Sequence, residues 1–380
     1  MIYRNYIKRL FDFLSSILLF IILLPVFLLL IVICTIAFNG RPFFKQQRAG
    51  YKERIFMMLK FKTMKDVVDH LHQPLPDHER LNSIGKFLRR TSLDELPQLI
   101  NVIKGEMSIV GPRPLLERYL PWYTESENKR HDIKPGITGY AQVNGRNILS
   151  WDERLALDVY YTENISLKID IAIIFKTIRQ LLFPGKIVAA DPRSTLNDFD
   201  DERSRKKSIR ISDQIILRKP VPNDATQLLE VKNNREGAAM LEHENSGYTL
   251  KDIQNWIWFH LNNPQNLVYA IVDHENKKII GHVGFYDIQN HGCDFGILIG
   301  LPSYWHKGIG LIVTKKMLHI GFKELYLNKI FLSVLQKNVR AVELYKQIGF
   351  KLIEEKAIQR NNETETIYRM LITENDLPTY

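Results

Sequence analysis

The stretch TSLDELPQLINVIKGEMSIVGPRP, residues 91–114, decides how the N-terminal half of the chain is interpreted. Two adjacent carboxylates, Asp94 and Glu95, stand at the start of a predicted helix. Arg89 and Arg90 precede them, and Arg113 follows between two prolines that restrict its backbone. Carboxylates close to fixed guanidinium groups are typical of sites that bind phosphates, because a guanidinium can donate two parallel hydrogen bonds.

Part of this pattern has a purely structural explanation. Ser92 and Glu95 fit the S-x-x-E capping box, in which the serine caps a helix and the glutamate reaches back to it. Acidic residues in a first turn also stabilise a helix through its dipole. Capping leaves Asp94 and the flanking arginines unexplained, so the stretch predicts a functional site.

This stretch, followed by KPGITGYAQVNGR at residues 134–146, resembles the bacterial sugar transferases. These monotopic phosphoglycosyl transferases move a sugar phosphate from a UDP-sugar to undecaprenyl phosphate. The resemblance runs from about Tyr3 to about Phe183. It implies that Asp94 is a covalent nucleophile and that Glu95, with Asp94 beside it, holds Mg²⁺. It also implies a set of substrate-binding side chains, which are Lys60, Arg89, Arg113 and Arg146.

Residues 14–38 are almost wholly apolar and carry no charge. The run is long enough to cross a bilayer, and it is too long for a cleavable signal peptide. Pro25 and basic residues on both flanks favour a re-entrant helix over about residues 11–38, because basic flanks stay cytoplasmic. The family breaks this helix at a Ser-Pro pair, whereas Leu24 precedes Pro25 here, so a spanning helix is the alternative. We expect a monotopic protein of the bacterial inner membrane with both domains on the cytoplasmic face.

The composition of the chain narrows its class and its partners. Its 380 residues predict two domains, and its net charge of +10 predicts an anionic partner. Because the basic clusters flank the apolar run, we expect inner-membrane lipids and phosphate-bearing substrates, and no nucleic acid. Two distant cysteines predict no disulfide framework. His70 and His72 show no metal-ligand spacing and are predicted to be surface residues.

Three segments are predicted along the chain, which are residues 1–190, 191–208 and 209–380. Residues 1–190 are predicted to form a small, mainly helical domain with the membrane helix. The charged residues 191–208 lack apolar periodicity and are predicted to be a flexible linker with little packing.

Within the first segment, apolar residues recur at helical spacing, which either core packing or docking beside the membrane explains. They are Ile169, Ile173, Ile174, Ile178 and Leu181.

Residues 209–380 alternate strand and helix patterns, which predicts a second α/β domain with a central mixed sheet. A glycine-containing turn at residues 307–310 precedes a helix, where backbone N–H groups can bind phosphate. With NVRAVELY at residues 338–345, it resembles the GNAT acetyltransferases, although Trp305 stands where the family has Gln or Arg. The resemblance implies that Tyr345 protonates the departing thiolate. It implies acetyl-CoA as co-substrate, held by Lys307, Gly308, Ile309, Gly310 and Asn338.

The sequence leaves the general base and the acceptor of this second domain open. An amine nucleophile must lose a proton, and the candidates to accept it are Asp294, Glu242, His243 and Glu244. The fusion suggests a UDP-amino sugar as acceptor, with UDP-N,N′-diacetylbacillosamine as the candidate product. The alternatives are an acetyltransferase of proteins and a non-catalytic module that binds acetyl-CoA.

Overall fold

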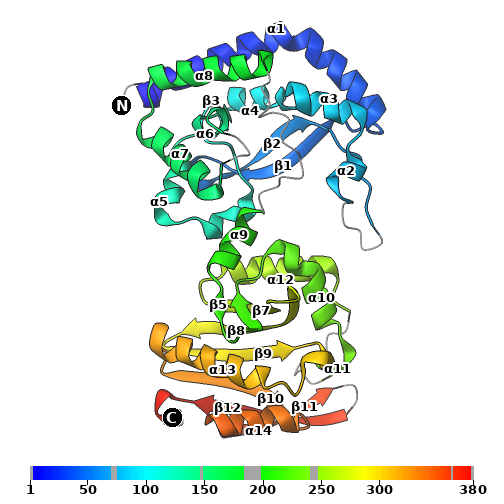
Figure 1. Cartoon of the computed structure of the whole chain (residues 1–380), viewed down its shortest axis with the longest axis vertical. Helices are drawn as coiled ribbons and strands as arrows, with labels where there is room; N and C mark the ends of the chain where they lie inside the picture. The colour runs from blue at the N-terminus through cyan, green and yellow to red at the C-terminus, as the bar shows by residue number, and fades with distance from the viewer. Residues whose placement is uncertain are drawn as a thin grey trace. The chain divides into compact units, whose positions relative to one another are not determined.

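The computed structural model describes residues 3–69, 75–145, 149–183, 198–239, 247–360 and 363–377. The chain divides into two compact units, Met1–Phe199 and Asp200–Tyr380, each of which is described by itself (Figure 1). The predicted α/β class with an N-terminal apolar helix is confirmed. Several predicted residues lie outside the described ranges: His70, His72, Arg146, Glu242, His243 and Glu244.

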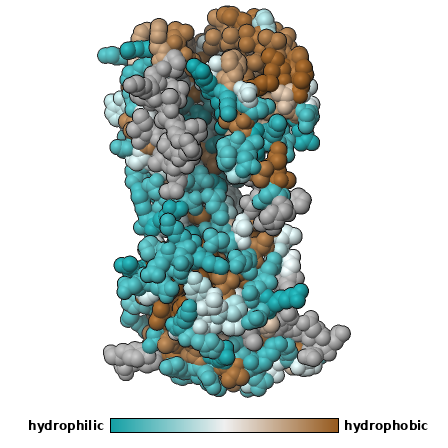
Figure 2. All heavy atoms as spheres, turned by 45° about the vertical axis from the view of Figure 1, so that its right-hand side comes forward, coloured by the Kyte–Doolittle hydropathy of each residue, from teal (hydrophilic) through white to brown (hydrophobic). Residues whose placement is uncertain are grey.

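Helix α1, Lys8–Ala37, follows a short π-helical turn at Tyr3–Ile7 and continues through Pro25. It therefore begins before the predicted residue 11. Among the described residues it is the one helix long and apolar enough to cross a membrane. Figure 1 shows it changing direction along its length, as a helix with an internal proline does. Apolar residues gather at this end of the unit (Figure 2).

Both ends of α1 pack against the same compact unit. Near its start, Lys8, Asp12 and Ser16 form a buried stripe at four-residue spacing. Near its end, buried apolar side chains pack against β2 and α3. This second contact is made by Phe27, Leu30 and Cys34 of α1 with Phe61 and Leu88. The helix is thus attached to unit 1 by polar contacts at one end and by apolar contacts at the other.

Asp170 is the centre of the polar attachment. Its carboxylate accepts hydrogen bonds from Lys8 Nζ, the Tyr3 hydroxyl and the Tyr161 hydroxyl, each at 2.6 Å. The Lys8–Asp170 pair is buried, with side-chain exposures of 9% and 4%. Arg9 adds a further contact by donating to the carbonyl of Val102, 2.7 Å away, near the C-terminal end of α4, where a cation is favourable.

Asp170→Asn is expected to destabilise unit 1 by about 3 kcal/mol, because it leaves the Lys8 ammonium buried without its counter-charge. Thermal unfolding of the full chain in detergent would measure this as a lowered Tm. The matched control is the double variant Lys8→Met with Asp170→Asn. It removes both charges, so its Tm should lie between those of the wild type and the single variant. An unchanged Tm in the single variant would contradict this account of how α1 is attached.

The rest of unit 1 is built from short elements. Strands β1 and β2 form an antiparallel hairpin, and β3 pairs with β4 in parallel. Their bounds are β1 Phe43–Ala49, β2 Ile55–Phe61, β3 Ser108–Val110 and β4 Gly136–Thr138. The helices after α1 are α2 Asp77–Arg80, α3 Ser83–Thr91, α4 Gln98–Lys104, α5 Glu125–Asn128, α6 Tyr140–Val143, α7 Trp151–Glu163 and α8 Leu167–Leu182. Helix α3 carries Arg89 and Arg90 in its last turn.

The glycine-rich segment after Lys134 serves backbone packing. A Cβ on Gly136 would lie 2.1 Å from the backbone nitrogen of Gly111, and one on Gly139 would lie 2.2 Å from the Gly111 carbonyl oxygen. These glycines therefore let two segments of the chain approach closely. Backbone packing therefore explains the glycines at positions 136 and 139.

Helix α8 presents two apolar faces. Ile173 is 1% exposed and packs in the core with Ile169 and Ile174. The opposite face carries an exposed apolar stripe at helical spacing: Leu167, Ile171, Phe175, Ile178 and Leu182. Of the five apolar residues predicted at helical spacing, Ile169, Ile173 and Ile174 pack in the core, whereas Ile178 and Leu181 are exposed. The exposed face belongs to the apolar end of the unit (Figure 2).

Unit 2 is built on an eight-stranded sheet with the order β11-β12-β10-β9-β8-β7-β6-β5. Among the strands that the structure describes in this sheet, β9 and β10 pair in parallel and the other neighbours pair antiparallel, so the predicted mixed sheet is confirmed. The strands are β5 Ile209–Arg210, β6 Ile215–Arg218, β7 Leu267–Asp273, β8 Lys278–Gln289, β9 Gly292–Ile299, β10 Lys329–Leu335, β11 Lys351–Arg360 and β12 Glu363–Ile372. The helices are α9 Phe199–Lys206, α10 Ala225–Lys232, α11 Arg235–Ala238, α12 Leu250–Asn262, α13 Ile309–His319 and α14 Val339–Ile348.

The predicted linker is partly structured. Residues 191–197 lie outside the described ranges, but α9 forms within the remainder. Phe199 is fully buried against the rings of Tyr119 and Trp151 in unit 1. In unit 2, the Ser204 hydroxyl donates to the carbonyl of Lys219. The expectation of little packing is therefore wrong from Phe199 onward, because one aromatic side chain in a charged segment is enough to anchor it.

Candidate functional sites

Unit 1 contains a cavity of about 620 Å³ that Asp94 and Glu95 line. Alternating side chains of the β1–β2 hairpin form one wall, since Phe44 pairs with Lys60 and Gln46 pairs with Met58. Four acidic side chains line it: Asp66, Asp94, Glu95 and Asp158. Eight basic side chains line it: Arg48, Lys60, Lys62, Arg80, Arg89, Arg113, Arg130 and Arg154. The excess of positive charge suits an anionic ligand.

The backbone at Ser92 directs the two carboxylates into this cavity. Ser92 ends α3 in the left-handed region, with φ of 56°, and its side chain does not cap the following 3₁₀ turn at Leu93–Glu95. The capping-box explanation is therefore wrong. Glu95 Oε1 instead accepts hydrogen bonds from Lys60 Nζ at 2.7 Å and from Arg113 at 3.0 Å. Lys60 Nζ also lies 3.9 Å from Asp94 Oδ2.

The adjacent carboxylates have different electrostatic environments. Burial raises the pKa of Glu95, but Arg113 and Lys60 outweigh that effect and lower the pKa to about 2. Burial raises the pKa of Asp94, and the neighbouring Glu95 charge raises it further. Burial and the nearby Arg113 lower the pKa of Lys60. Glu95 is thus held ionised in a fixed ion-pair network, while the ion pair of Asp94 among the described residues is the 3.9 Å contact with Lys60.

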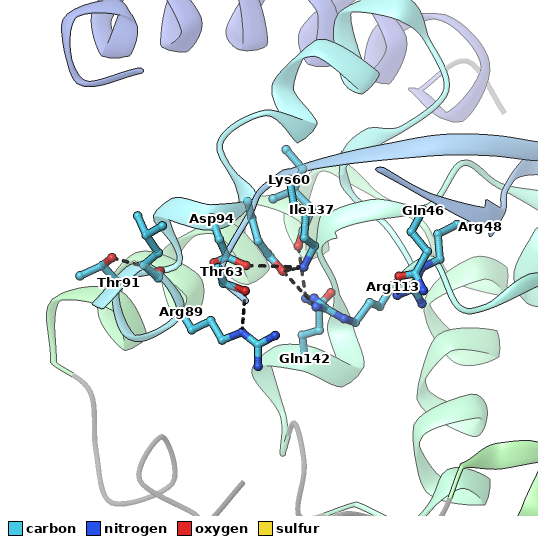
Figure 3. A network of polar contacts seen from close by, with 12 residues as sticks. Gln46, Arg48, Lys60, Thr63, Arg89, Thr91, Asp94, Arg113, Ile137 and Gln142 are labelled. Carbon is cyan, nitrogen blue, oxygen red and sulfur yellow. Dashed lines mark hydrogen bonds and ion pairs between the residues drawn. The ribbon is translucent and has the colours of Figure 1, made fainter. Parts of the chain in front are cut away.

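The arginines of the cavity differ in how they are held. Arg89 donates through Nε to the Thr63 hydroxyl at 3.1 Å (Figure 3). Arg48 and Arg154 line the cavity without a carboxylate within 4 Å in the described ranges, and the sequence analysis missed both. Arg48 donates to the Gln46 side chain at 2.6 Å and to a backbone carbonyl. The alternation of Phe44, Gln46 and Arg48 along β1 is the signal that could have found it.

Asp158 has a structural role in the cavity wall. It pairs with the buried guanidinium of Arg130 at 2.8 Å, and this guanidinium also donates to the carbonyl of Arg113 at 2.7 Å. Burial raises the pKa of Asp158, although Arg130 opposes that shift. Arg130 and Asp158 therefore fix the backbone that carries Arg113, which in turn contacts Glu95.

The carboxylate pair is compatible with a Mg²⁺ ion completed by substrate. No cluster of three or more His, Cys, Asp or Glu side chains suited to a metal occurs in the described ranges. Mg²⁺ commonly binds one or two carboxylates and takes its other ligands from phosphates and water. Lys60 and Arg113 both contact Oε1 of Glu95, so the second Glu95 oxygen and the Asp94 carboxylate are the oxygens that fit such an ion.

Unit 2 has an opening in its sheet between β9 and β10. The parallel register covers only three pairs, of Gly292–Asp294 with Lys329–Phe331. Beyond Asp294 the two strands no longer pair, although β9 stays paired to β8 and β10 stays paired to β12. Unpaired backbone groups along a strand edge can hydrogen-bond an extended ligand. The opening leads toward the turn that precedes α13.

That turn has the features of a phosphate-binding helix start. Gly308 is the N-cap of α13 and has a φ of 71°, which favours glycine. A Cβ on Gly310 would meet only ordinary contacts, at 3.6 Å from Leu344 and 3.8 Å from Ile299, so packing does not require a glycine there. Trp305 donates its indole N–H to the carbonyl of Ile299 at 2.7 Å and so ties the turn to the end of β9.

The other predicted residues of unit 2 are placed as follows. Tyr345 on α14 is buried, and burial raises its pKa. Asn338 caps α14 by accepting from the backbone N–H of Ala341 at 3.3 Å, so its presence already has a structural reason. Asp294 forms an ion pair with Arg369 on β12. The structure does not test the roles predicted for these residues.

Unit 1 thus has a basic cavity with a carboxylate pair that suits a phosphorylated ligand, and unit 2 has a mixed sheet with a strand opening and a glycine-capped helix start. The family description "Bacterial sugar transferase" matches residues 3–184, and "Acetyltransferase (GNAT) domain" matches residues 214–351. The uncharacterized sugar transferase EpsL of Bacillus subtilis is 46% identical over 176 residues, which cover 46% of this chain and 87% of that protein. The chain therefore belongs to the bacterial sugar transferase family, and it carries a GNAT domain in its second unit.

Other relatives extend the comparison. The exopolysaccharide production protein ExoY of Sinorhizobium fredii is 40% identical, with 45% of this chain and 83% of that protein covered. The undecaprenyl-phosphate galactose phosphotransferase of Salmonella typhimurium is 38% identical, with 47% of this chain and 41% of that protein covered. Among solved structures, the spermidine N-acetyltransferase of Vibrio cholerae with CoA and spermine is 23% identical, covers 43% of this chain and 98% of that chain, and has a TM-score of 0.40.

Proposed function

We propose that unit 1 transfers a sugar phosphate from a UDP-sugar to undecaprenyl phosphate, and that unit 2 uses acetyl-CoA to N-acetylate a UDP-amino sugar. The observation that supports the first activity most is the Asp94–Glu95 pair in a basic cavity of a sugar transferase family member. Relatives described as undecaprenyl-phosphate phosphotransferases support the lipid acceptor. UDP-N,N′-diacetylbacillosamine remains our candidate for the sugar that links the two activities.

The proposed reaction has two displacements at one phosphorus atom. An Asp94 carboxylate oxygen attacks the β-phosphorus of the UDP-sugar, and UMP leaves with the electron pair of the broken P–O bond. An oxygen of undecaprenyl phosphate then attacks the same phosphorus and releases Asp94 as a carboxylate. Lys60 and Arg113, fixed by Glu95, stabilise negative charge on the transferred phosphoryl group. Arg48, Arg89 and Arg154 are positioned to bind the donor phosphates.

Asp94 and Glu95 would hold Mg²⁺ together with the donor diphosphate. The ion would neutralise phosphate charge at this site when bound. The two adjacent carboxylates would then have different roles. Glu95 would hold Lys60, Arg113 and the metal ion in place, whereas Asp94 would supply the attacking oxygen.

We further propose that α1 is re-entrant and that both units face the cytoplasm. The support is that residues near both ends of α1 pack against the same compact unit. A straight helix of 30 residues would be about 45 Å long and would place its ends on opposite sides of a bilayer. The exposed apolar stripe of α8 is suited to lie in the membrane interface beside α1.

Cysteine labelling in intact cells tests this topology. Tyr6→Cys and Arg41→Cys place thiols on exposed positions at the two ends of α1, while Cys34 and Cys293 are buried. We expect neither variant to react with a membrane-impermeant thiol reagent until the cells are permeabilised. Labelling of Tyr6→Cys from outside, with Arg41→Cys still protected, would instead establish a spanning helix.

The acetyltransferase proposal rests on the β9–β10 opening, the α13 turn and the GNAT match. Mass spectrometry of products from a UDP-amino sugar, acetyl-CoA and undecaprenyl phosphate tests both activities together. We expect an acetylated UDP-sugar, UMP and a lipid-linked phosphosugar. Consumption of acetyl-CoA only with protein amines would favour the protein acetyltransferase. Binding of acetyl-CoA without its consumption by any amine would favour the non-catalytic module.

A further inference from the structure

Lys232 is a buried amine in unit 2 without a carboxylate partner. It ends α10, is 9% exposed, and has no carboxylate within ion-pairing distance in the part of the chain that the structure describes. Its Nζ lies 4.1 Å from the centre of the Trp256 ring and 5.5 Å from that of Tyr248. Burial lowers its pKa to about 8, so the amine still carries its charge at neutral pH. Aromatic faces attract a cation, but they do not supply the opposite charge that a buried ammonium needs.

The aromatic rings packed around Lys232 belong to uncharged side chains, and the nearby Asp287 carboxylate acts on one of them, His260. The Trp256 ring lies 4.7 Å from His260 and 5.0 Å from His282, and His260 lies 5.4 Å from Tyr286. Burial, together with the nearby Lys232 charge, lowers the pKa of both histidines, which are therefore neutral imidazoles. His282 Nδ1 is buried and has no hydrogen-bond partner among the described residues. Such a group can hydrogen-bond a ligand, but it cannot neutralise Lys232.

The sheet register connects this cluster to the β9–β10 opening. His282 and Tyr286 lie four residues apart on β8, so both side chains are on one face of the sheet. Across the antiparallel pair, Tyr286 is opposite Asp294, which is the last residue of β9 paired with β10. Directly opposite residues share a face, with side chains about 5 Å apart. The cluster thus lies on the face of the sheet beside the point where the two strands separate.

We propose that Lys232, Trp256, His260, His282 and Tyr286 form the acceptor site of the acetyltransferase unit, and that Lys232 binds a phosphate carried by the amine substrate. This inference rests on the proposed acetyltransferase function and narrows its substrate class to phosphate-bearing amines, of which a nucleotide-linked amino sugar is one. A polyamine is disfavoured, because Lys232 repels it. Near this face, Asp294 is neutralised by Arg369, and the charge of Asp287 acts on His260.

The test compares acceptors with and without phosphates. The full chain in detergent is assayed for CoA release with UDP-4-amino-4,6-dideoxy-N-acetylglucosamine, with the same amino sugar lacking UDP, and with spermidine. For Lys232→Met, which keeps an apolar chain on Trp256, we expect the kcat/KM ratio of the UDP-linked sugar to the free sugar to fall about tenfold, as for loss of one charge-assisted contact. The control Lys251→Met removes an exposed lysine on α12 and should leave this ratio unchanged.

Each outcome decides a different point. A kcat/KM ratio of UDP-linked to free sugar that falls in Lys232→Met and stays unchanged in Lys251→Met supports the phosphate contact. An unchanged ratio, with the wild type active on the UDP-linked sugar, refutes the inference and leaves the proposed function intact. Preference of the wild type for spermidine, or no acetylation of either sugar, refutes the proposed acceptor and this inference with it.

Discussion

Asp94→Asn is expected to abolish phosphosugar transfer, with a loss of at least about 10⁴-fold, as for removal of a covalent nucleophile. Asparagine preserves the size of the side chain, but its amide oxygen does not form the acyl phosphate. UMP release from the UDP-sugar would measure the rate. Mass spectrometry of the intact protein, incubated with donor and without lipid acceptor, would detect the phosphosugar adduct in the wild type and its absence in the variant.

Two further variants separate nucleophilic attack from other effects of charge. Asp66→Asn removes another carboxylate that lines the same cavity and pairs with Lys62, and it should change the rate by less than about twofold. Glu95→Gln removes the charge that Lys60 and Arg113 share, so it should slow transfer strongly while a slow adduct on Asp94 still forms. Wild-type transfer in Asp94→Asn would exclude the covalent mechanism.

Residues 91–114 show how far sequence reasoning reaches at this site. The family resemblance implied that Asp94, Glu95, Lys60, Arg89, Arg113 and Arg146 share a site. The structure places the first five around one cavity, and Arg146 lies outside the described ranges. The contacts within the group could not be predicted, because they join residues far apart in sequence. The Glu95 pairing with Lys60 spans 35 positions and depends on the β1–β2 register. The local pattern alone favoured a capping box, which the left-handed backbone at Ser92 prevents.

In unit 2, short continuous apolar runs mark the strands β6, Ile215–Arg218, and β7, Leu267–Asp273. The pair β11–β12 was missed, because a strand such as KLIEEKAIQR at an edge of the sheet is rich in charge and lacks an apolar face. Lys232 was missed for a related reason. Its burial arises from contacts with α12 and β8, and no local pattern around it differs from an ordinary helix end.

Tyr345→Phe is expected to slow acetylation by about 10²-fold while leaving transfer of a supplied, fully acetylated UDP-sugar unchanged. The tyrosine is buried on α14, and burial raises its pKa, so its hydroxyl stays protonated at neutral pH and can donate a proton to the departing CoA thiolate. Phenylalanine keeps the ring that packs edge-on against Phe350 at 5.6 Å, so the fold should be retained. Release of the CoA thiol and release of UMP, measured on the same full-length preparation, separate the two activities.

The control for this variant is Tyr326→Phe, which removes a hydroxyl from a tyrosine that is 72% exposed and should affect neither activity. The expected selectivity follows from the division of the chain into two compact units with separate constellations: Arg89 and Arg113 with Asp94 in one, and the turn at Gly308 with Tyr345 in the other. Fusion would then raise the local concentration of acetylated donor near the membrane without new contacts. If Tyr345→Phe also stopped transfer of the supplied acetylated donor, the two units would be chemically coupled and their proposed independence would be wrong.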